Sequence, residues 1–349
     1  MKKKKINIFA DADLFRLIVV TVSIFALMAS LRPSKYLTLA NFSSMTIQIP
    51  EIGLYTLALT LVLITGQTDI SVVNIGNLAG LIGAYILKDC VAKGVTGAAV
   101  WGYVALAFVV MILVGIICGA INGFTVTYFG VPTMLVTMAT SSIYKGIATG
   151  LTSGEAVNGF PEELLWFGTN YVGGVVSYAF FLLVIVFAAV AFLINKTKYG
   201  IELRFIGSNI KASEYAGIKV NKVLMKTYIL AGVISAIAGF EIVTRTNNIR
   251  YDYGTSYINQ ALIAAVLGAT DPNGGYVRMT CLALGLLAVQ FLSSGFNLMR
   301  LTGNTKLMAW GGLLILVICF DALMREIKRR KALKEIKNRR REKEAELKF

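Results

Sequence analysis

Histidine is absent from this 349-residue sequence, and cysteine is rare. Without histidine, the chain has no imidazole for acid–base catalysis and no His ligand for a metal ion. The 4 cysteines lie in or beside apolar segments and show no CxxC spacing: Cys90, Cys118, Cys281 and Cys319. We therefore expect reduced cysteines that serve packing, no metal site and no cofactor bound by this chain.

Charged residues are also scarce, and a nucleotide-binding motif is missing. Only 15% of the residues are charged, whereas soluble domains average about 25%. No GxxxxGK[ST] loop occurs, so the chain is not expected to bind ATP. The net charge of +15 is not gathered in a basic folded domain, which argues against a nucleic-acid partner. No cleavable signal peptide is evident either, because the first apolar run is long enough to remain as a membrane span.

Long apolar runs, by contrast, are abundant. Hydrophobic residues make up 56% of the chain, and the mean hydropathy is +0.69, which is more apolar surface than one aqueous core can hide. The runs predict an all-α, polytopic transmembrane bundle of about ten spans. They lie near residues 14–31, 46–65, 70–87, 101–128, 132–152, 175–195, 223–243, 256–269, 278–298 and 305–323. Segments 46–65, 70–87 and 132–152 carry polar residues and could be broken or re-entrant.

The distribution of Lys and Arg predicts cytoplasmic N- and C-termini. Most of the 34 basic residues fall on the N-terminal lysines, on the 196–222 loop and on the C-terminal tail. The chain then divides into a cytoplasmic tail (1–13), a transmembrane domain (14–323) and a basic cytoplasmic tail (324–349). The last tail is either a solvated end that fixes topology or a basic helix that binds membrane lipids or a partner subunit.

Two features lie within this frame. Gly115, Gly119 and Gly123 recur every four residues, which predicts a smooth helix face for close packing. In the polar 196–222 loop, residues 209–216 can form a short helix that is capped by Asn209 and ended by Gly217. Such a helix could dock a partner, or the segment could be a plain connecting loop.

The residues of this loop are similar to those of a known transporter family. Phe205-Ile-Gly-Ser-Asn209, an alanine-containing helix and then Gly217-Ile-Lys-Val220 resemble the cytoplasmic loop of bacterial ribose- and xylose-type ABC permeases. Lys211-Ala-Ser213 followed by Gly217 keeps the spacing of the importer coupling motif, with Lys in place of the usual Glu. The resemblance implies that the following residues couple the chain to an ATPase: Ile206, Gly207, Asn209, Ala212, Glu214, Ala216, Gly217 and Ile218.

Three further stretches resemble the same family in the same order. Gly66-Gln-Thr-Asp-Ile-Ser71 is similar to its Gly-Gly-Ile-Asp-Leu-Ser box. Gly119-Ala-Ile-Asn-Gly123, with the following Val131-Pro132 and Val136-Thr137, is similar to its Gly-x-x-Asn-Gly…Pro-x-x-Ile-x-Thr stretch. Residues 254–275 are similar to a segment that ends in a Gly-rich turn. The resemblance covers about residues 50–322.

Some residues depart from the family pattern. Ile258 and Gln260 stand where the family commonly has acidic residues, Gln67 replaces a glycine, and Gly268-Ala269 replaces a glycine pair. Residues 250–254 also look like the permeases of autoinducer-2 importers, which often work as unlike pairs. The resemblance therefore implies a second permease subunit as partner, and a heterodimer is favoured over a homodimer.

The resemblance implies a function as well. It indicates the permease subunit of an ABC importer in the bacterial inner membrane, carrying a monosaccharide-like solute such as ribose, xylose or autoinducer-2. The partners would be an ATPase subunit, which binds ATP and Mg, and a periplasmic or lipid-anchored sugar-binding protein. The chain itself would be a transport subunit and not an enzyme. The exact solute is left open.

Polar residues inside the predicted spans are candidates for the solute path, which should be weakly polar. They are Asn74, Asn77, Asn122, Thr137, Asn259 and Gln260. The alternative is that they form hydrogen bonds between helices. Asp69 is expected to cap the helix that follows it, with solute contact as the alternative. Lys145 could pair with Glu51 or Glu241 inside the bundle, or all three could reach the membrane surface.

Two other protein classes are alternatives to the importer. An ion-coupled secondary transporter would want carboxylates inside the membrane and usually an internal repeat. Only Glu51 and Glu241 are well inside spans, no duplication joins the two halves, and a carrier needs no docking helix at 205–218. A membrane enzyme would want a histidine, a metal cluster or a nucleophile elbow. The sequence favours the importer.

Overall fold

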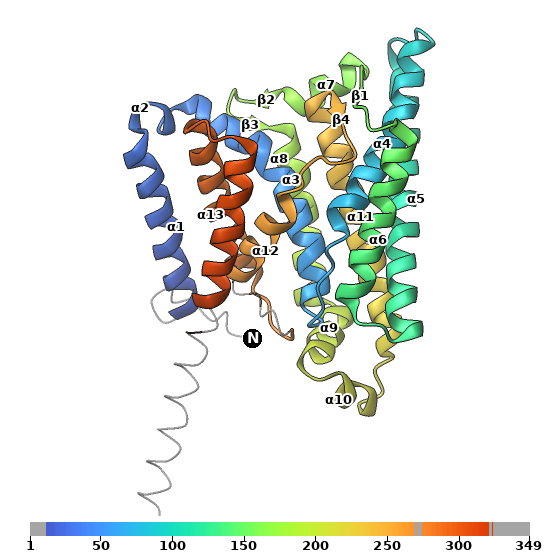
Figure 1. The fold of residues 1–349 in the computed structure, drawn as a ribbon, viewed down its shortest axis with the longest axis vertical. Coiled ribbons are helices and arrows are strands. Elements are labelled where there is room, and N and C mark those ends of the chain that lie inside the picture. Colours follow the sequence, from blue (N-terminus) through green and yellow to red (C-terminus); the bar gives the residue numbers. More distant parts are fainter. Residues whose placement is uncertain (1–11, 269, 271–273, 321–322, 324–349) are drawn as a thin grey trace, which may run out of the picture.

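The computed structural model describes residues 12–268, 270, 274–320 and 323. Most of the predicted N-terminal tail and all of the predicted tail 324–349 lie outside these residues. Helices dominate the described part of the chain, and the long ones run roughly along one direction (Figure 1). The prediction of an all-α polytopic bundle is confirmed.

The first half of the chain forms six helices. They are α1 (Ala12–Leu31), α2 (Pro33–Tyr36), α3 (Leu39–Leu63), α4 (Val72–Ala92), α5 (Ala98–Phe129) and α6 (Thr133–Thr152). The short helix α2 turns the chain between the two long helices α1 and α3. The predicted span 46–65 begins earlier, at Leu39, because the Thr38 hydroxyl accepts a hydrogen bond from the Asn41 N–H group (3.3 Å) and caps α3.

The second half contains the remaining helices. They are α7 (Glu162–Thr169), α8 (Tyr178–Lys196), α9 (Lys198–Ser208), α10 (Ile210–Tyr215), α11 (Val220–Thr246), α12 (Tyr257–Leu267), α13 (Met279–Leu298) and a final helix, Gly303–Phe320. Two antiparallel pairs of short strands lie with α7 at the end opposite α10 (Figure 1). They join β1 (Val157–Asn158) to β4 (Asn248–Ile249) and β2 (Tyr171–Val172) to β3 (Val176–Ser177).

Eight described helices are long and apolar enough to cross a membrane: α1, α3, α4, α5, α8, α11, α13 and Gly303–Phe320. Helix α6 also has 20 residues, but it is less apolar. Helix α12 has 11 residues and spans about 16 Å, which is shorter than a hydrocarbon core of about 30 Å. All ten predicted segments are helical, and the count of ten crossings stays a prediction.

The irregular backbone is not where the sequence suggested. The segments predicted to be broken form the continuous helices α3, α4 and α6. The non-helical backbone lies instead in the link 64–71, between α3 and α4, and around the short helix α12. The sequence also treated residues 198–208 as part of a loop, whereas they form α9.

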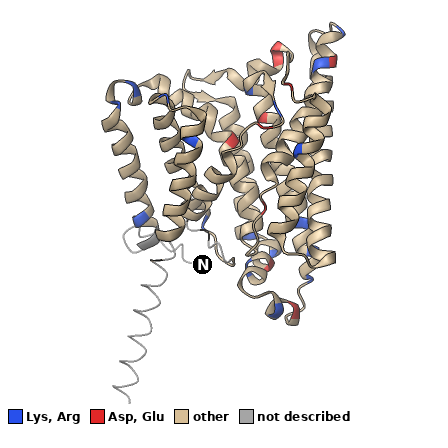
Figure 2. Cartoon of the chain, viewed as in Figure 1, with Lys and Arg blue, Asp and Glu red and all other residues tan. Residues whose placement is uncertain are grey.

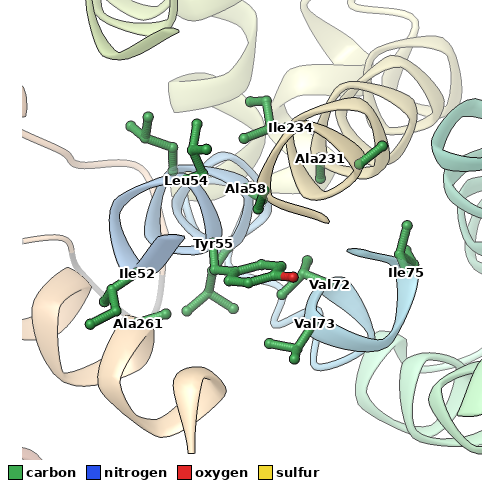
Figure 3. Packing of buried hydrophobic residues seen from close by; sticks show 14 of the residues in the cluster. Ile52, Leu54, Tyr55, Ala58, Val72, Val73, Ile75, Ala231, Ile234 and Ala261 are labelled. Atoms are coloured by element: carbon green, nitrogen blue, oxygen red, sulfur yellow. The ribbon is translucent and has the colours of Figure 1, made fainter. Parts of the chain in front are cut away.

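The core is built around α3 and α11. Most residues of α3 from Ile49 to Leu63 are buried, and Tyr55 points its ring toward the start of α4 (Figure 3). On its other side, α3 packs Ala58 toward Ala231 of α11 (Figure 3). Neighbouring helices thus cover α3 over this stretch, so that it has no surface toward lipid. Polar side chains of α3 must therefore find hydrogen-bond partners inside the protein.

The glycine stripe of α5 packs against α11, as the spacing predicted. A Cβ atom added at Gly115 would meet the carbonyl oxygen of Gly232, and one added at Gly119 would meet that of Tyr228. A Cβ atom at Gly123 would lie 2.9 Å from the sulfur of Met225. The two helices therefore touch backbone to backbone.

Basic and acidic residues lie at both ends of the bundle (Figure 2). The end formed by α9 and α10 and their flanks holds Lys196, Lys198, Arg204, Lys211, Lys219 and Lys222. At the opposite end, α7 carries Glu162 and Glu163. Helix α1 begins at the α10 end (Figure 1), which fits the predicted cytoplasmic N-terminus.

Candidate functional site

A groove with a volume of about 370 Å³ lies between α4, α6 and α12. Its polar lining comes from Thr68, Asn74, Ser141, Lys145, Thr255 and Asn259. The rest of the wall is aliphatic, including Leu59 and Leu262. Amide, hydroxyl and ammonium groups on an apolar wall can orient a polar solute through a few hydrogen bonds without holding it tightly.

Two of the six predicted path residues line this groove. Asn74 donates from Nδ2 to the Ser141 hydroxyl (2.6 Å) and to the Ser141 carbonyl (3.3 Å), which ties α4 to α6. Asn259 lies on the first turn of α12. Both side chains are half-buried, so part of each faces the groove.

The other four predicted path residues lie in the packing between segments. Each is at most 3% exposed: Asn77, Asn122, Thr137 and Gln260. Asn77 donates to the carbonyl oxygen of Tyr253 (2.8 Å), and Gln260 donates to the Ser256 hydroxyl (2.9 Å). None of the four lines the groove. Asn77, Asn122 and Thr137 form hydrogen bonds to other segments, whereas the bond of Gln260 lies at the start of its own helix.

Asp69 is 1% exposed and organises the link 64–71. Its Oδ1 atom accepts hydrogen bonds from the Ser71 N–H group (2.8 Å) and from the Ser71 hydroxyl (2.6 Å). Ser71 is the residue before α4, so the carboxylate shapes the approach to the helix instead of binding the N–H groups of its first turn. The predicted capping role is corrected in this respect.

The same link is held by neighbouring helices. Asn122 of α5 donates to the Ser71 hydroxyl (2.8 Å), and the Tyr144 hydroxyl of α6 donates to Asn122 Oδ1 (3.2 Å). The Thr137 hydroxyl donates to the Thr68 carbonyl and accepts from the Ile70 N–H group, each over 3.4 Å. Protein groups thus cover and bind this irregular backbone, the condition under which it is tolerated at membrane depth.

A buried ion pair lies nearer the α7 end. Arg245 Nε donates to Glu51 Oε1 (2.5 Å), and the Tyr257 hydroxyl donates to Glu51 Oε2 (2.6 Å). Arg245 also donates from Nη2 to the Tyr253 hydroxyl (2.8 Å). The sequence left open whether Lys145 pairs with Glu51 or Glu241 or whether all three reach the membrane surface. Glu51 pairs with Arg245 instead, because α11 continues to Thr246 and brings Arg245 into the bundle.

The ion pair bears on the secondary-transporter alternative. That reading rested on Glu51 and Glu241 as possible ion sites, and Glu51 has both oxygens occupied by protein donors. Glu241 is 1% exposed, and its carboxyl oxygens have no hydrogen-bond partner among the described residues. A single buried carboxyl group does not make an ion site of the several oxygen ligands that cations require.

The predicted short helix in the cytoplasmic loop is α10. Asn209 caps it, because its Oδ1 atom accepts from the Ala212 N–H group (3.0 Å), and Gly217 follows its end with a φ of 80°. Helices α9 and α10 together project from the bundle (Figure 1) and are called the cytoplasmic knob below, after the side of the membrane that the distribution of Lys and Arg predicts. Of the predicted coupling residues, five are exposed: Asn209, Ala212, Glu214, Ala216 and Gly217. Ile206 is buried, and Gly207 and Ile218 are half-buried.

The sequence reading missed the apolar surface of the cytoplasmic knob. Tyr215 is 93% exposed, Phe205 is 57% exposed and Ile210 is 42% exposed. Exposed aromatic and aliphatic side chains on an otherwise polar loop mark a protein-binding surface. In the sequence, this surface was indicated by Tyr215, an aromatic residue in the short and otherwise largely polar helix α10.

The base of the cytoplasmic knob is joined to α3 through glycines. The Gly275 N–H group donates to the Ile64 carbonyl (2.7 Å), and a Cβ atom at Gly207 would collide with both groups. Gly274 and Gly275 adopt φ values of 93° and 82°, which favour glycine. Three chain segments, α9, the start of the link 64–71 and the turn at Gly274 and Gly275, therefore meet backbone to backbone.

A second cavity, of about 550 Å³, lies between the cytoplasmic knob and this link. Ile210, Glu214 and Asn221 line one side, and residues 66–68 line the other. Thr68 lines both this cavity and the groove between α4, α6 and α12. The link 64–71 therefore lies between this cavity and the groove between α4, α6 and α12.

Membrane-spanning helices, a polar groove at membrane depth and a projecting knob define a transport permease. Residues 41–318 match the family model described as the branched-chain amino acid transport system permease component, and the chain belongs to this family. It is the permease subunit of an ABC importer in the bacterial inner membrane, not an enzyme.

The relatives are permeases of importers. The chain is 31% identical over 277 residues to the autoinducer 2 import system permease protein LsrD of Klebsiella pneumoniae, which covers 76% of this chain and 79% of that protein. It is 29% identical over 300 residues to the ribose import permease protein RbsC of Escherichia coli, which covers 85% of this chain and 89% of that protein. No solved structure shows a significant match.

Proposed function

We propose that the chain translocates a small, monosaccharide-like solute, of the ribose, xylose or autoinducer-2 kind, through the groove between α4, α6 and α12. The observation that carries this proposal is that Thr68 lines both the groove and the cytoplasmic cavity. The names of the relatives support the class of solute. The amide and hydroxyl groups of Asn74, Ser141, Thr255 and Asn259 suit the hydroxyl groups of a neutral sugar.

Energy would enter through the cytoplasmic knob. In this proposal the exposed ring of Tyr215 and the caps of α10 sit in a groove of a partner ATPase, which binds ATP and Mg²⁺. Movement of the knob passes through Gly207 and Gly275 to Ile64, at the start of the link. In this proposal the link alternates between two arrangements. Their free energies need differ by only a few kcal/mol for nucleotide-dependent contacts to shift the equilibrium.

The solute would arrive at the other end of the bundle. A sugar-binding protein, periplasmic or lipid-anchored, is proposed to dock over α7 and the paired strands β1 and β4. Glu162 and Glu163 begin α7, and the segment 153–174 holds no basic residue, so the docking partner should present basic groups there. The basic C-terminal tail is proposed to bind anionic membrane lipids.

A second permease subunit would complete the path, and an unlike partner is favoured. The support is that Ile258 and Gln260 stand where the family commonly has acidic residues. A contact surface is available on α6, where Gly146 and Gly150 lie four residues apart with open space beside both. Small residues at this spacing let a helix of a neighbouring subunit come close.

Uptake by cells that lack the chromosomal copy of this gene tests the proposal. Cells carrying the wild-type chain should take up one labelled solute among ribose, xylose and autoinducer-2, and cells carrying Thr68→Trp should not, because the indole fills the space beside the link 64–71. Ile185→Trp is the matched control, since Ile185 of α8 is 67% exposed and far from the groove lining. Normal uptake with Thr68→Trp would place the path elsewhere. No difference between cells with and without the gene, for any of the three solutes, would reject the solute class.

A further inference from the structure

Lys145 lies near the middle of the length of α6, and the importer function described so far does not use it. It is the thirteenth residue of the 20-residue helix α6, which places its backbone about 18 Å along a helix of about 30 Å. Helix α6 packs beside α4 and α5, both long enough to cross a membrane. Lys145 is exposed and lines the groove between α4, α6 and α12.

No acidic side chain balances this charge within the part of the chain that the structure describes. The ion pairs there join Lys93 to Asp89, Lys198 to Glu202, Arg245 to Glu51 and Arg250 to Asp252. Lys145 instead lies over the ring of Tyr251, with Nζ 5.7 Å from the ring centre. The aromatic face holds the ammonium group without neutralising it.

The neighbours of Lys145 show which side of α6 faces water. Ser142 and Thr149 lie three residues before and four residues after it, on the same side of the helix. Ile143, Ile147 and Leu151 are exposed in a separate apolar row, on the opposite side of α6. An unpaired ammonium group at this depth is costly against lipid, so the row with Lys145 faces the aqueous groove.

We propose that Lys145 is a specificity-determining residue for the transported solute, and this inference rests on the proposed transport groove. Its ammonium group has three donors and no acceptor, so it binds hydroxyl, carbonyl or carboxylate oxygens of a solute. The positive charge of the ammonium group excludes cationic solutes from the groove and admits neutral and anionic ones. Asn74, Ser141 and Asn259 complete the contacts with a polyhydroxylated solute.

A cysteine probe in the groove tests the charge directly. Ser141→Cys is introduced into a chain in which the four native cysteines are replaced, and native membranes are treated with a thiosulfonate reagent that is either anionic (sulfonatoethyl) or cationic (trimethylammonioethyl). The ratio of the two labelling rates should favour the anion. Lys145→Gln should lower this ratio about tenfold, because a unit charge several ångströms from the thiol acts differently on the two reagents. Lys145→Arg should keep the ratio, and Lys145→Glu should invert it.

Lys93→Gln is the matched control. It removes one positive charge from a lysine at the end of α4, which is paired with Asp89 and lies outside the groove lining. It should leave the labelling ratio unchanged. An unchanged ratio in Lys145→Gln overturns the proposal. So does labelling of Ser141→Cys only by a membrane-permeant maleimide, because the position would then face lipid. Labelling needs no transport, so this result is independent of whether the solute is a sugar.

Discussion

At the scale of single residues, the Glu51–Arg245 pair shows how the protein keeps charge inside the bundle. Both oxygens of Glu51 accept hydrogen bonds, from Arg245 and from Tyr257, and the Glu51 side chain is 1% exposed. A buried pair of this kind adds little stability over an apolar pair, because desolvation offsets the attraction. Removing one partner alone is different, since it leaves the other charge buried and unpaired.

This difference predicts the outcome of a double-mutant cycle. Arg245→Met should lower the free energy of unfolding by about 3–5 kcal/mol, because Glu51 then stays buried without a counter-charge. Glu51→Gln combined with Arg245→Met should recover most of the loss. Thermal unfolding in detergent measures both, with the wild-type chain as reference. A loss in the double variant equal to the sum of the losses in Arg245→Met and in Glu51→Gln alone would show that the two side chains are not coupled.

The same residues show the limit of reading side chains from the sequence. Glu51 was found as a buried acid, but its partner was missed because the predicted span ended at residue 243 and left Arg245 outside. Because the predicted helix ended one turn too early, Arg245 was not considered as a partner of Glu51, and Lys145 was left as a possible one. Asn77, Asn122, Thr137 and Gln260 could not be told from groove residues, because polarity within a span does not reveal which neighbour satisfies it.

At the scale of elements, the crossing of α5 and α11 depends on the absence of side chains. Gly119→Ala should lower the free energy of unfolding by about 1–3 kcal/mol, because the new methyl group meets the Tyr228 carbonyl and forces the helices apart. Gly102→Ala on the same helix is the control. Nothing lies within 4 Å of a Cβ atom there, so it should be neutral or stabilise by up to about 1 kcal/mol. The thermal unfolding midpoints of the two variants in detergent test this prediction. Equal shifts of the midpoint in Gly119→Ala and Gly102→Ala would contradict the backbone contact.

The cytoplasmic knob carries a second prediction at this scale. Tyr215→Ser should weaken the binding of the ATPase by about 2 kcal/mol, roughly thirtyfold, because a fully exposed aromatic ring is a typical anchor at an interface. Co-purification of the ATPase and solute-dependent ATP hydrolysis should fall together, while membrane insertion is unchanged. Tyr171→Ser, at the opposite end of the bundle, should change neither.

A change at Gly217 tests the backbone shape of the cytoplasmic knob, whereas the change at Tyr215 tests its surface. Its φ of 80° costs a residue with a side chain about 1–2 kcal/mol, although the space around it is open. Gly217→Leu should therefore abolish uptake and ATPase coupling by altering the end of α10, with insertion intact. Uptake at the wild-type rate in Gly217→Leu would show that α10 is not the coupling element.

Helices were easier to predict than the segments between them. The periodic apolar runs located all ten long segments, and the cap and glycine at residues 209 and 217 located α10. The link 64–71 and the turn at Gly274 and Gly275 could not be predicted in the same way. Thr137 and Ile64 bind their backbone groups and Asn122 binds the Ser71 hydroxyl. These residues come from other parts of the chain, and hydrogen bonds between distant segments leave no local pattern.

At the scale of the whole molecule, three surfaces of the chain are proposed to contact other proteins. The cytoplasmic knob exposes Tyr215, α7 presents Glu162 and Glu163, and α6 leaves Lys145 and the space beside Gly146 uncovered. A membrane protein that acted alone would not expose a lysine and bare glycines on a membrane-spanning helix. Such groups favour contact with water or with a neighbouring subunit. The chain therefore has the form of one part of an assembly.

The last prediction concerns the neighbour at α6. Two copies of the chain, each with a different affinity tag, are expressed together in the native cell and extracted in mild detergent. If the pair is unlike, purification through one tag should recover an ATPase and a second, different permease, but not the copy with the other tag. Gly146→Leu should reduce recovery of the second permease while retaining the ATPase, because the leucine fills the open space on α6 and the cytoplasmic knob is untouched. Recovery of both tags together would establish a homodimer, and the replacement of acidic residues by Ile258 and Gln260 would then need an explanation within a symmetric path.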